Sequence, residues 1–420
     1  MYYKIYGGSK LKGRVTVTAS KNALLPILAC CLMIKGEVVL ERCPRLLDVE
    51  NMLKIIRRTG GVARFEGENL VVDCTNSQPV PICEELTCPI RSSIFILGPL
   101  LSRFSKAQVC YPGGCSIGLR PIDLHLYGLR TLGAKIIEEN GEINCDGTLM
   151  ANCSVFLDFP SVGATENIMM ASVLKRGRTV ISNCAREPEI CDLANFINVM
   201  GGKVYGAGTD KIVIDGVKRL FGGNYSPLKD RIVAGTYMIA SAITGGDVEI
   251  EGANCRHLHS LCEKLTIAGV KIINTQRGIR VCAPKRIKSV RKIETQPYPG
   301  FPTDLQPQIT ALLSTAQGTS VVVENLFENR FNFTSELLKM GADVTVKDRV
   351  AIIKGNAQLN PSIVEAQDLR GGASLVLAAL CAEGESIVKN VHHIDRGYCD
   401  LALDLQKIGA KIERVSNRLV

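Results

Sequence analysis

The chain has 420 residues, 46% of them apolar, which is enough for two hydrophobic cores and excludes a disordered chain. Its net charge of +9 comes from 50 basic and 41 acidic residues, and aromatic residues make up only 5%, with no Trp. This composition does not favour a basic surface with interleaved aromatics. We therefore expect no nucleic-acid partner, and small acidic substrates instead.

The 17 cysteines form no CxxC pair, and most of them lie in apolar contexts. We expect them to be small core residues in a reducing cytosol, which predicts a cytoplasmic protein without a zinc site or other metal. The first residues lack the apolar core of a secretory signal, and the longest apolar run, residues 23–34, is too short to span a bilayer. We therefore expect no membrane insertion, and no organic cofactor is implied.

Six apolar stretches follow one another at intervals of about 70 residues, and such internal repeats decide the fold. They span residues 23–34, 93–101, 165–174, 234–243, 305–313 and 373–380. Because each is apolar on every side, we expect six helices enclosed by the rest of the protein. Helix starts carry unpaired N–H groups and a positive dipole end, so the polar residues that open these helices are candidate anion sites. These residues are Lys21, Arg91, Ser161, Arg231, Asp304 and Arg370.

A second set of helices is predicted in phase with the first. Each is an amphipathic stretch that ends in a glycine, the usual helix C-cap, and precedes a strand-like run. The glycines are Gly60, Gly133, Gly201, Gly269, Gly341 and Gly409. Each repeat is therefore expected to contain a strand, a buried helix, a strand, an amphipathic helix and one or two further strands. An arginine is expected near each amphipathic helix start, namely Arg45, Arg120, Arg186, Arg256, Arg330 and Arg396.

Three repeats enclose three buried helices, so six repeats predict two α/β domains. The first domain is expected to span residues 21–228, with repeats one to three and the loop of Cys115. The second is expected to combine residues 1–20 with 229–420, because the first strand precedes the first buried helix. Several helix starts and arginines in one cleft would suit a substrate that carries phosphate and carboxylate groups. No Walker A or GxGxxG motif follows a strand, so we expect no nucleotide held in that way.

Eight segments, in order along the whole chain, carry a resemblance to a known family: ASKNALLPIL, PGGCSIGLRPIDLH, SVGAT, AREPEI, FPTDLQ, ENRF, DLR and HIDRGY. The chain resembles the UDP-N-acetylglucosamine 1-carboxyvinyltransferases, a family of enolpyruvyl transferases. The resemblance implies a two-domain inside-out α/β barrel with the EPSP synthase-like fold and an active site in the interdomain cleft. It also implies transfer of enolpyruvate from phosphoenolpyruvate to the sugar 3-hydroxyl with loss of phosphate, the first committed step of peptidoglycan synthesis.

The family's functional residues are carried over onto matching positions. Lys21, Asp304, Arg396 and Cys115 are implied as catalytic, and Cys115 is also implied as the thiol that fosfomycin attacks. The implied substrate-binding residues are Lys21, Asn22, Arg91, Arg120, Pro121, Ile122, Asp123, Leu124, Ser161, Val162, Asp304, Leu326, Arg330, Arg370 and Arg396. Arg120 close to Cys115 favours a thiolate. Asp304 suits a general base but equally a helix N-cap, and His125 and His393 suit packing or hydrogen bonding as well as catalysis.

Two positions depart from the family pattern. Leu47 and Phe159 are apolar where the family usually has lysines that meet anions. Each lost charged contact costs about 1.5–3 kcal/mol. These two positions leave one alternative open, a non-catalytic or weakly active paralogue that binds nucleotide sugar and regulates the pathway. A second alternative is the shikimate-pathway enolpyruvyl transferase, which has the same fold. The loop cysteine argues against the second.

Overall fold

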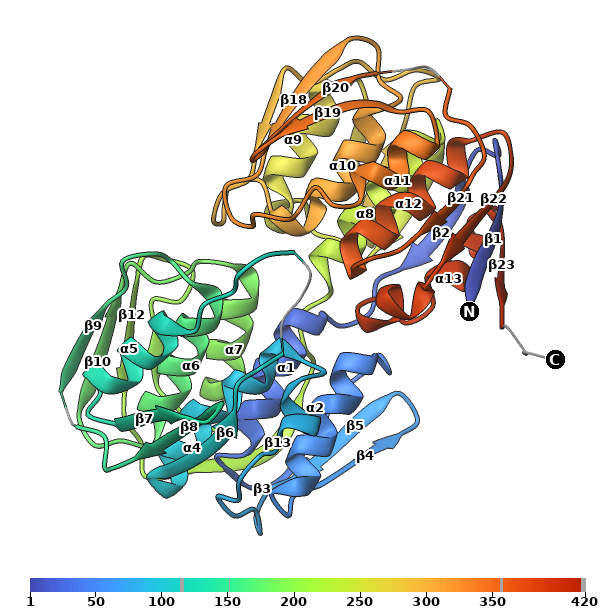
Figure 1. Ribbon diagram of the computed structural model, residues 1–420. Coiled ribbons are helices and arrows are strands. Elements are labelled where there is room, and N and C mark those ends of the chain that lie inside the picture. The colour runs from blue at the N-terminus through green and yellow to red at the C-terminus, as the bar shows by residue number, and fades with distance from the viewer. Residues whose placement is uncertain (114–116, 151, 356–357, 417–420) are drawn as a thin grey trace. The chain divides into compact units, whose positions relative to one another are not determined.

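The computed structural model describes residues 1–113, 117–150, 152–355 and 358–416, and the chain divides into two compact units (Figure 1). The N-terminal unit comprises Ala19–Gly114 and Arg120–Leu228. The C-terminal unit comprises Met1–Thr18, Cys115–Leu119 and Lys229–Val420. The described residues 117–119 thus belong to the C-terminal unit, whereas the sequence analysis assigned their loop to residues 21–228. Within that unit, the Asn329 backbone N–H donates to the Ile117 carbonyl oxygen at 3.0 Å.

The N-terminal unit encloses three apolar helical segments. These are α1 (Lys21–Cys31), α4 (Leu97–Phe104), which continues the 3-10 helix η1 (Arg91–Ile96), and α6 (Val162–Val173). Around them lie the amphipathic helices α2 (Leu47–Arg58), α5 (Asp123–Thr131) and α7 (Pro188–Val199), with the short α3 (Glu84–Thr87). The second apolar stretch, predicted as one helix over 93–101, therefore begins as a 3-10 helix.

Three sheets complete this unit. Their strand orders are β13-β3-β5-β4, β6-β8-β7 and β11-β12-β10-β9. β13 pairs in parallel with β3, so the last strand of this half of the sequence returns to the first repeat. The strands are β3 (Ile34–Leu40), β4 (Val62–Glu66), β5 (Asn69–Asp73), β6 (Lys106–Cys110), β7 (Lys135–Glu139), β8 (Glu142–Asp146), β9 (Cys153–Phe156), β10 (Arg178–Ser182), β11 (Val204–Tyr205), β12 (Lys211–Asp215) and β13 (Leu220–Tyr225).

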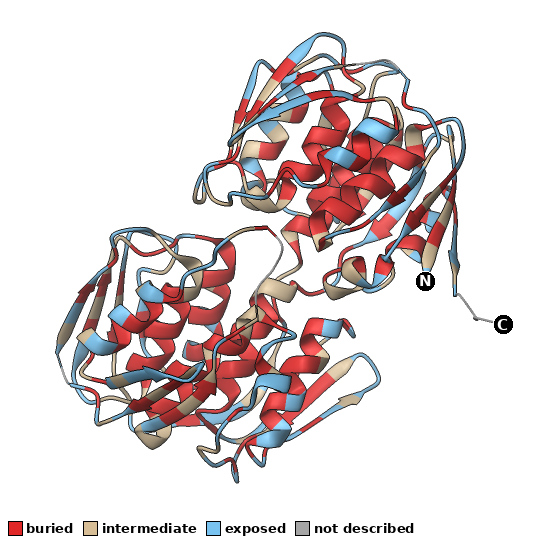
Figure 2. Cartoon of the chain, in the orientation of Figure 1, coloured by how far each residue is buried: buried red, intermediate tan, exposed pale blue. Residues whose placement is uncertain are grey.

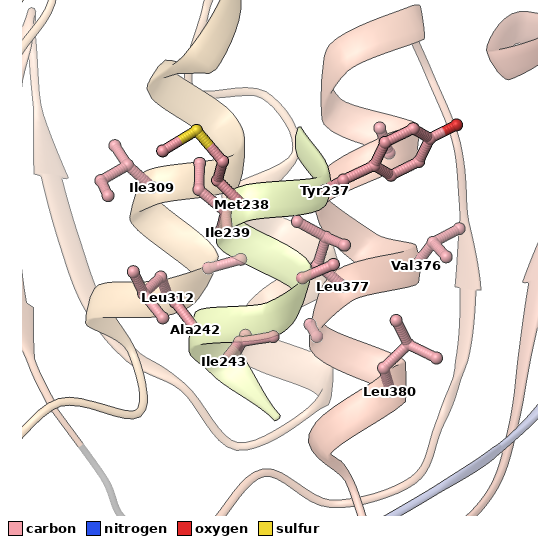
Figure 3. Packing of buried hydrophobic residues seen from close by; sticks show 14 of the residues in the cluster. Tyr237, Met238, Ile239, Ala242, Ile243, Ile309, Leu312, Val376, Leu377 and Leu380 are labelled. Atoms are coloured by element: carbon pink, nitrogen blue, oxygen red, sulfur yellow. The ribbon is translucent and has the colours of Figure 1, made fainter. Parts of the chain in front are cut away.

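The C-terminal unit repeats this plan. Its buried helices are α8 (Arg231–Ile243), α10 (Gln306–Leu313), which follows the 3-10 helix η3 (Thr303–Leu305), and α12 (Leu369–Cys381). Figure 3 shows side chains of these three helices, among them Met238, Leu312 and Leu377, packed together in one apolar cluster. Its other helices are η2 (Cys255–His257), α9 (His259–Ile267), α11 (Thr334–Lys339), η4 (Val391–Arg396) and α13 (Leu401–Lys407).

The first strand of the chain lies in this unit, between strands from the other end of the sequence. In Figure 1, β1 lies between β22 and β23, and it pairs antiparallel with both. The strand orders are β21-β22-β1-β23, β15-β16-β14-β2 and β17-β18-β20-β19. The strands are β1 (Tyr2–Gly7), β2 (Lys12–Thr16), β14 (Asp247–Glu251), β15 (Lys271–Asn274), β16 (Gly278–Cys282), β17 (Lys292–Glu294), β18 (Thr319–Val323), β19 (Asp343–Lys347), β20 (Val350–Lys354), β21 (Ile363–Glu365), β22 (Gly384–Lys389) and β23 (Lys411–Val415).

Burial follows the predicted division between enclosed and amphipathic helices. In Figure 2 the inner helices are red along most of their length, whereas the outer helices and strands carry exposed residues. The six predicted C-cap glycines all adopt φ between 82° and 99°, a left-handed conformation that other residues rarely adopt. The prediction that an amphipathic helix ends at each of these glycines is therefore confirmed.

Candidate functional site

The start of α1 places a lysine ammonium beside a buried carboxylate. Lys21 is the first residue of the helix, and its Nζ lies 3.2 Å from Oδ2 of Asp48, near the start of α2. Asp48 is buried and Lys21 is half-buried. Asn22, next on α1, is also half-buried. Because the ion pair limits the rotamers open to Lys21, its positive charge is held at the helix start, where the backbone also favours anions.

A second cationic cluster lies around the start of η1. Burial, and then the charge of Arg120, lower the pKa of Arg91 to about 10. The Arg91 guanidinium also donates to the Pro112 carbonyl oxygen at 3.4 Å. Burial lowers the pKa of His125 to about 3, and the charges of Arg91 and Arg120 add to this effect. His125 is therefore neutral near pH 7.

The amide of Asn167 determines which nitrogen of His125 carries the proton. Its Oδ1 accepts from the backbone N–H of Gly98 at 2.7 Å, so its Nδ2 is the donor facing Nδ1 of His125 at 3.2 Å. Nδ1 therefore accepts and Nε2 carries the hydrogen. A Cβ placed on Gly163 would lie 3.0 Å from this Nε2, so the N–H is next to the start of α6. Of the roles considered for His125, the geometry supports hydrogen bonding.

The remaining residues expected in the N-terminal unit lie at two helix starts. Ser161 is the N-cap of α6, and its Oγ accepts from the Ala164 backbone N–H at 3.3 Å. Val162 is the first residue of α6 and is half-buried. In the segment before α5 and in its first turn, Arg120, Pro121 and Asp123 are exposed, Leu124 is half-buried and Ile122 is buried.

In the C-terminal unit, Asp304 is held by two buried arginines. Nη2 of Arg330 lies 2.7 Å from Oδ1 of Asp304, and Nη2 of Arg370 lies 3.1 Å from Oδ2. Both arginines are only 3% exposed, whereas the Asp304 side chain is 28% exposed. The two guanidinium groups stabilise the ionised carboxylate and fix its orientation, while part of it stays open to a substrate.

The alternative role of Asp304 as a helix N-cap is wrong. Pro302 occupies the N-cap position of η3, and Leu305 occupies that of α10. Arg396 is half-buried and ends η4, shortly before α13 begins at Leu401, so it lies near the helix start as expected. Two residues later, the hydroxyl of Tyr398 contacts Nη1 of Arg370 at 3.5 Å.

Glu324 is a buried residue that sequence reasoning missed. One of its carboxylate oxygens accepts from Oγ1 of Thr303, next to Asp304, at 3.0 Å. The other accepts from the backbone N–H groups of Leu326 and Phe327 at 2.9 and 3.2 Å. Glu324 thereby ties the predicted contact Leu326 to the segment that carries Asp304. The only available signal was a charged residue directly after the apolar strand β18.

Cys115 lies outside the described residues, but Gly113, two residues before it, is described. The Gly113 backbone N–H donates to the Thr87 carbonyl oxygen at 3.2 Å. A Cβ on Gly113 would lie 1.9 Å from the carbonyl oxygen of Cys88, so only glycine fits at this position. The expectation that Cys115 reacts with substrate stays a prediction.

The two apolar residues that depart from the family pattern, Leu47 and Phe159, are both exposed. Leu47 is the first residue of α2, directly before Asp48, and Phe159 precedes α6 by three residues; each is 45% exposed. An exposed large apolar residue in place of a cation lowers the local affinity for anions without a gain in burial. Among the described residues, no group of three metal-ligating side chains occurs, and no helix is long and apolar enough to cross a membrane.

Comparison with known proteins decides the family. The family model of EPSP synthase (3-phosphoshikimate 1-carboxyvinyltransferase) matches residues 5–405. The chain belongs to this family. UDP-N-acetylglucosamine 1-carboxyvinyltransferase 2 of Caldanaerobacter subterraneus is 48% identical over 413 residues, which cover 98% of the chain and 99% of the relative. UDP-N-acetylglucosamine 1-carboxyvinyltransferase 1 of Carboxydothermus hydrogenoformans is 48% identical, with 98% of each protein covered.

Solved structures of the EPSP synthase family share the fold. The enolpyruvyl transferase NikO from Streptomyces tendae superposes with a TM-score of 0.88 at 25% identity, with 98% of each chain covered. EPSP synthase from Acinetobacter baumannii has a TM-score of 0.76 at 18% identity, covers 98% of the chain and 99% of its own length, and supports the fold alone. The fold and the enzyme class expected from the sequence, a carboxyvinyl transferase with the EPSP synthase-like fold, are confirmed.

Proposed function

We propose that the chain transfers the enolpyruvyl group of phosphoenolpyruvate to the 3-hydroxyl of UDP-N-acetylglucosamine and releases phosphate. The observation that carries this proposal is Asp304, whose carboxylate is oriented by two buried guanidinium groups and is 28% exposed. UDP-N-acetylglucosamine as the acceptor is supported by the names of relatives that are 48% identical over nearly the whole chain.

Asp304 is the proposed general base of the reaction. Its carboxylate accepts the proton of the sugar 3-hydroxyl as that oxygen bonds to C2 of the enolpyruvyl group. Orientation matters because a base must lie within hydrogen-bond distance of the proton that it removes. Arg330 and Arg370 supply this orientation, and Glu324 supports it through Thr303.

Cationic residues are the proposed partners of the two anionic substrates. Lys21 with Asn22, Arg120 and Arg396 are proposed to bind phosphoenolpyruvate and to stabilise the charge that develops as the phosphate leaves. We propose Cys115 as the acid that protonates C3 of phosphoenolpyruvate, or as the thiol that adds to it. The nucleotide sugar is proposed to be bound by Arg91, residues 120–124, Ser161, Val162, Asp304 and Leu326.

The consequences for the cell follow from the reaction. We propose that the chain catalyses the first committed step of peptidoglycan synthesis in the cytoplasm. Through that step it would contribute to cell wall biogenesis, and thereby to cell shape, cell division and the cell cycle. A cytoplasmic location is consistent with the cysteines among the described residues, all of which are free thiols.

The direct test measures phosphate released by the purified protein from phosphoenolpyruvate. We expect release with UDP-N-acetylglucosamine as acceptor and none with shikimate 3-phosphate. Fosfomycin is expected to stop the reaction and to add its mass to the peptide that contains Cys115, and a Cys115→Asp variant should gain no mass. Release with shikimate 3-phosphate but not with UDP-N-acetylglucosamine would instead favour the shikimate-pathway enolpyruvyl transferase.

A regulatory nucleotide-sugar-binding protein is the second candidate, favoured by the exposed Leu47 and Phe159. Calorimetric binding of UDP-N-acetylglucosamine without any phosphate release would support this candidate and reject catalysis.

Leu47→Lys is expected to lower the KM for phosphoenolpyruvate by about tenfold, because a new charged contact is worth about 1.5–3 kcal/mol and solvent screens part of it at an exposed site. Steady-state kinetics measure the change. Val199→Lys, which adds the same charge at an exposed apolar position of α7, is the control and should leave the KM unchanged. Equal effects of the two variants would mean that only net charge matters.

A further inference from the structure

Two cysteines of the C-terminal unit lie in contact, away from the residues assigned to the proposed reaction. Cys255 opens η2, and Cys262 is the fourth residue of α9. The thiol of Cys262 donates a hydrogen bond to Sγ of Cys255 at 3.7 Å. A disulfide has an S–S distance of about 2.05 Å, so these sulfurs need to approach by roughly 1.7 Å to form one. That distance can be covered by a side-chain rotation with a small backbone shift.

Hydrogen bonding and burial give the two thiols different roles: Cys255 is the nucleophile, and Cys262 keeps its proton. Both side chains are half-buried and pack against the core of this unit. The hydrogen bond from Cys262 lowers the pKa of Cys255 to about 7. The same hydrogen bond, followed by burial, raises the pKa of Cys262. The hydrogen bond therefore favours the thiolate of Cys255, the form that reacts with oxidants, and Cys262 keeps its proton.

We propose that Cys255 and Cys262 are a reversible dithiol–disulfide site that is closed by a hydroperoxide. The Cys255 thiolate attacks the terminal oxygen of the hydroperoxide; the S–O bond forms, the O–O bond breaks, and the leaving oxygen takes a proton and departs as an alcohol, or as water from hydrogen peroxide. The Cys262 sulfur then attacks the sulfenic acid; the S–S bond forms, the S–O bond breaks, and water leaves with the thiol proton. The two thiols lose two electrons and two protons in total, and a reducing dithiol returns them.

Closing this disulfide strains the segment that leads to Asp304. The Tyr298 hydroxyl donates to the carbonyl oxygen of Arg256 at 3.1 Å, and Oγ of Ser260 donates to the carbonyl oxygen of Gly300 at 3.2 Å. Arg256 and Ser260 both lie between the two cysteines, one in η2 and one in α9. The small backbone shift that closure needs moves η2 relative to α9, so at least one of these hydrogen bonds changes. Neither the disulfide nor its coupling to residues 298–301 rests on the proposed function.

The test for the disulfide uses the full-length reduced protein at pH 7, treated with hydrogen peroxide, alkylated and digested for mass spectrometry. We expect the peptide with Cys255 and Cys262 to lose two hydrogens and to resist alkylation, and dithiothreitol to restore both thiols. Cys262→Ser should stop at a sulfenic acid on Cys255, trapped by dimedone. Cys282→Ser, which changes another half-buried cysteine of this unit, is the matched control and should still form the disulfide. Full alkylation of both thiols after peroxide treatment would overturn the proposal.

Hydrogen–deuterium exchange tests the coupling without any reference to activity. We expect faster exchange of residues 298–301 in the oxidised protein than in the reduced protein, and no such difference in Cys262→Ser. Equal exchange in both states would overturn the coupling to the Asp304 segment. A protein that forms the disulfide on oxidation but releases no phosphate in its reduced state would count against the proposed function and leave the redox site in place.

Discussion

Asp304→Asn is expected to lower the turnover number by about 10²–10⁴-fold, the usual contribution of a general base. The amide cannot accept the proton of the sugar hydroxyl, although it has nearly the same shape as the carboxylate. Steady-state phosphate release measures the loss. UDP-N-acetylglucosamine should still bind, because Arg330 and Arg370 keep their other hydrogen bonds, to the Thr303 carbonyl oxygen and to the Tyr398 hydroxyl.

A stability measurement separates catalysis from folding in this variant. Removing one partner of a buried ion pair costs about 3–5 kcal/mol, and the amide oxygen of Asn can still accept one hydrogen bond, so we expect a smaller loss. Urea unfolding at the assay temperature shows whether the variant is folded. Glu328→Gln, which removes an exposed ion pair with Arg349, is the control and should leave turnover unchanged. Undiminished turnover in a folded Asp304→Asn protein would remove Asp304 as the base.

The second large effect concerns Glu166, a carboxyl group in the core of the N-terminal unit. It is 1% exposed, and neither oxygen has a hydrogen-bond partner among the described residues. Burial, and then the charges of Glu189 and Glu187 on and next to α7, raise the pKa of Glu166 well above its ordinary 4.5. The folded protein therefore holds a proton on Glu166 at pH values where the unfolded chain has lost it.

This difference makes stability depend on pH, and its sign follows from proton linkage. Between pH 4.5 and the raised folded-state pKa, the folded state binds one proton more than the unfolded state, so the free energy of unfolding falls as pH rises. The slope from this one group is about 1.4 kcal/mol per pH unit. The stabilisation from the protonated Glu166 is complete below pH 4.5 and is lost as the pH rises from 4.5 through the folded-state pKa.

Glu166→Gln removes this titration while keeping the size of the side chain. We expect the variant to be more stable than the wild type at pH 8, with a difference that shrinks steadily toward pH 5. Urea unfolding across this pH range measures it. Glu139→Gln, at an exposed position of β7, is the control and should show no pH-dependent difference. A difference for Glu166→Gln that is constant with pH would contradict a protonated Glu166.

Local features of the chain determined most of the architecture. The period of the apolar stretches, the glycines at helix ends and the β-branched runs are signals within one repeat, so they predicted the buried helices, the amphipathic helices and their C-caps. They were less accurate at helix starts: the stretches 93–101 and 305–313 begin in the 3-10 helices η1 and η3. Helix starts depend on capping geometry, which apolar periodicity does not encode.

By itself, then, the sequence determined the repeats, the fold, the enzyme family and the candidate residues. The tertiary structure alone decided their partners: Arg330 and Arg370 lie 26 and 66 residues from Asp304 yet hold its two oxygens. It alone also paired Cys262 with Cys255 and enclosed Glu166 beside two other carboxylates. The physical reason is that periodicity and capping act over one or two helical turns, whereas ion pairs, hydrogen bonds and burial depend on which distant segments pack together.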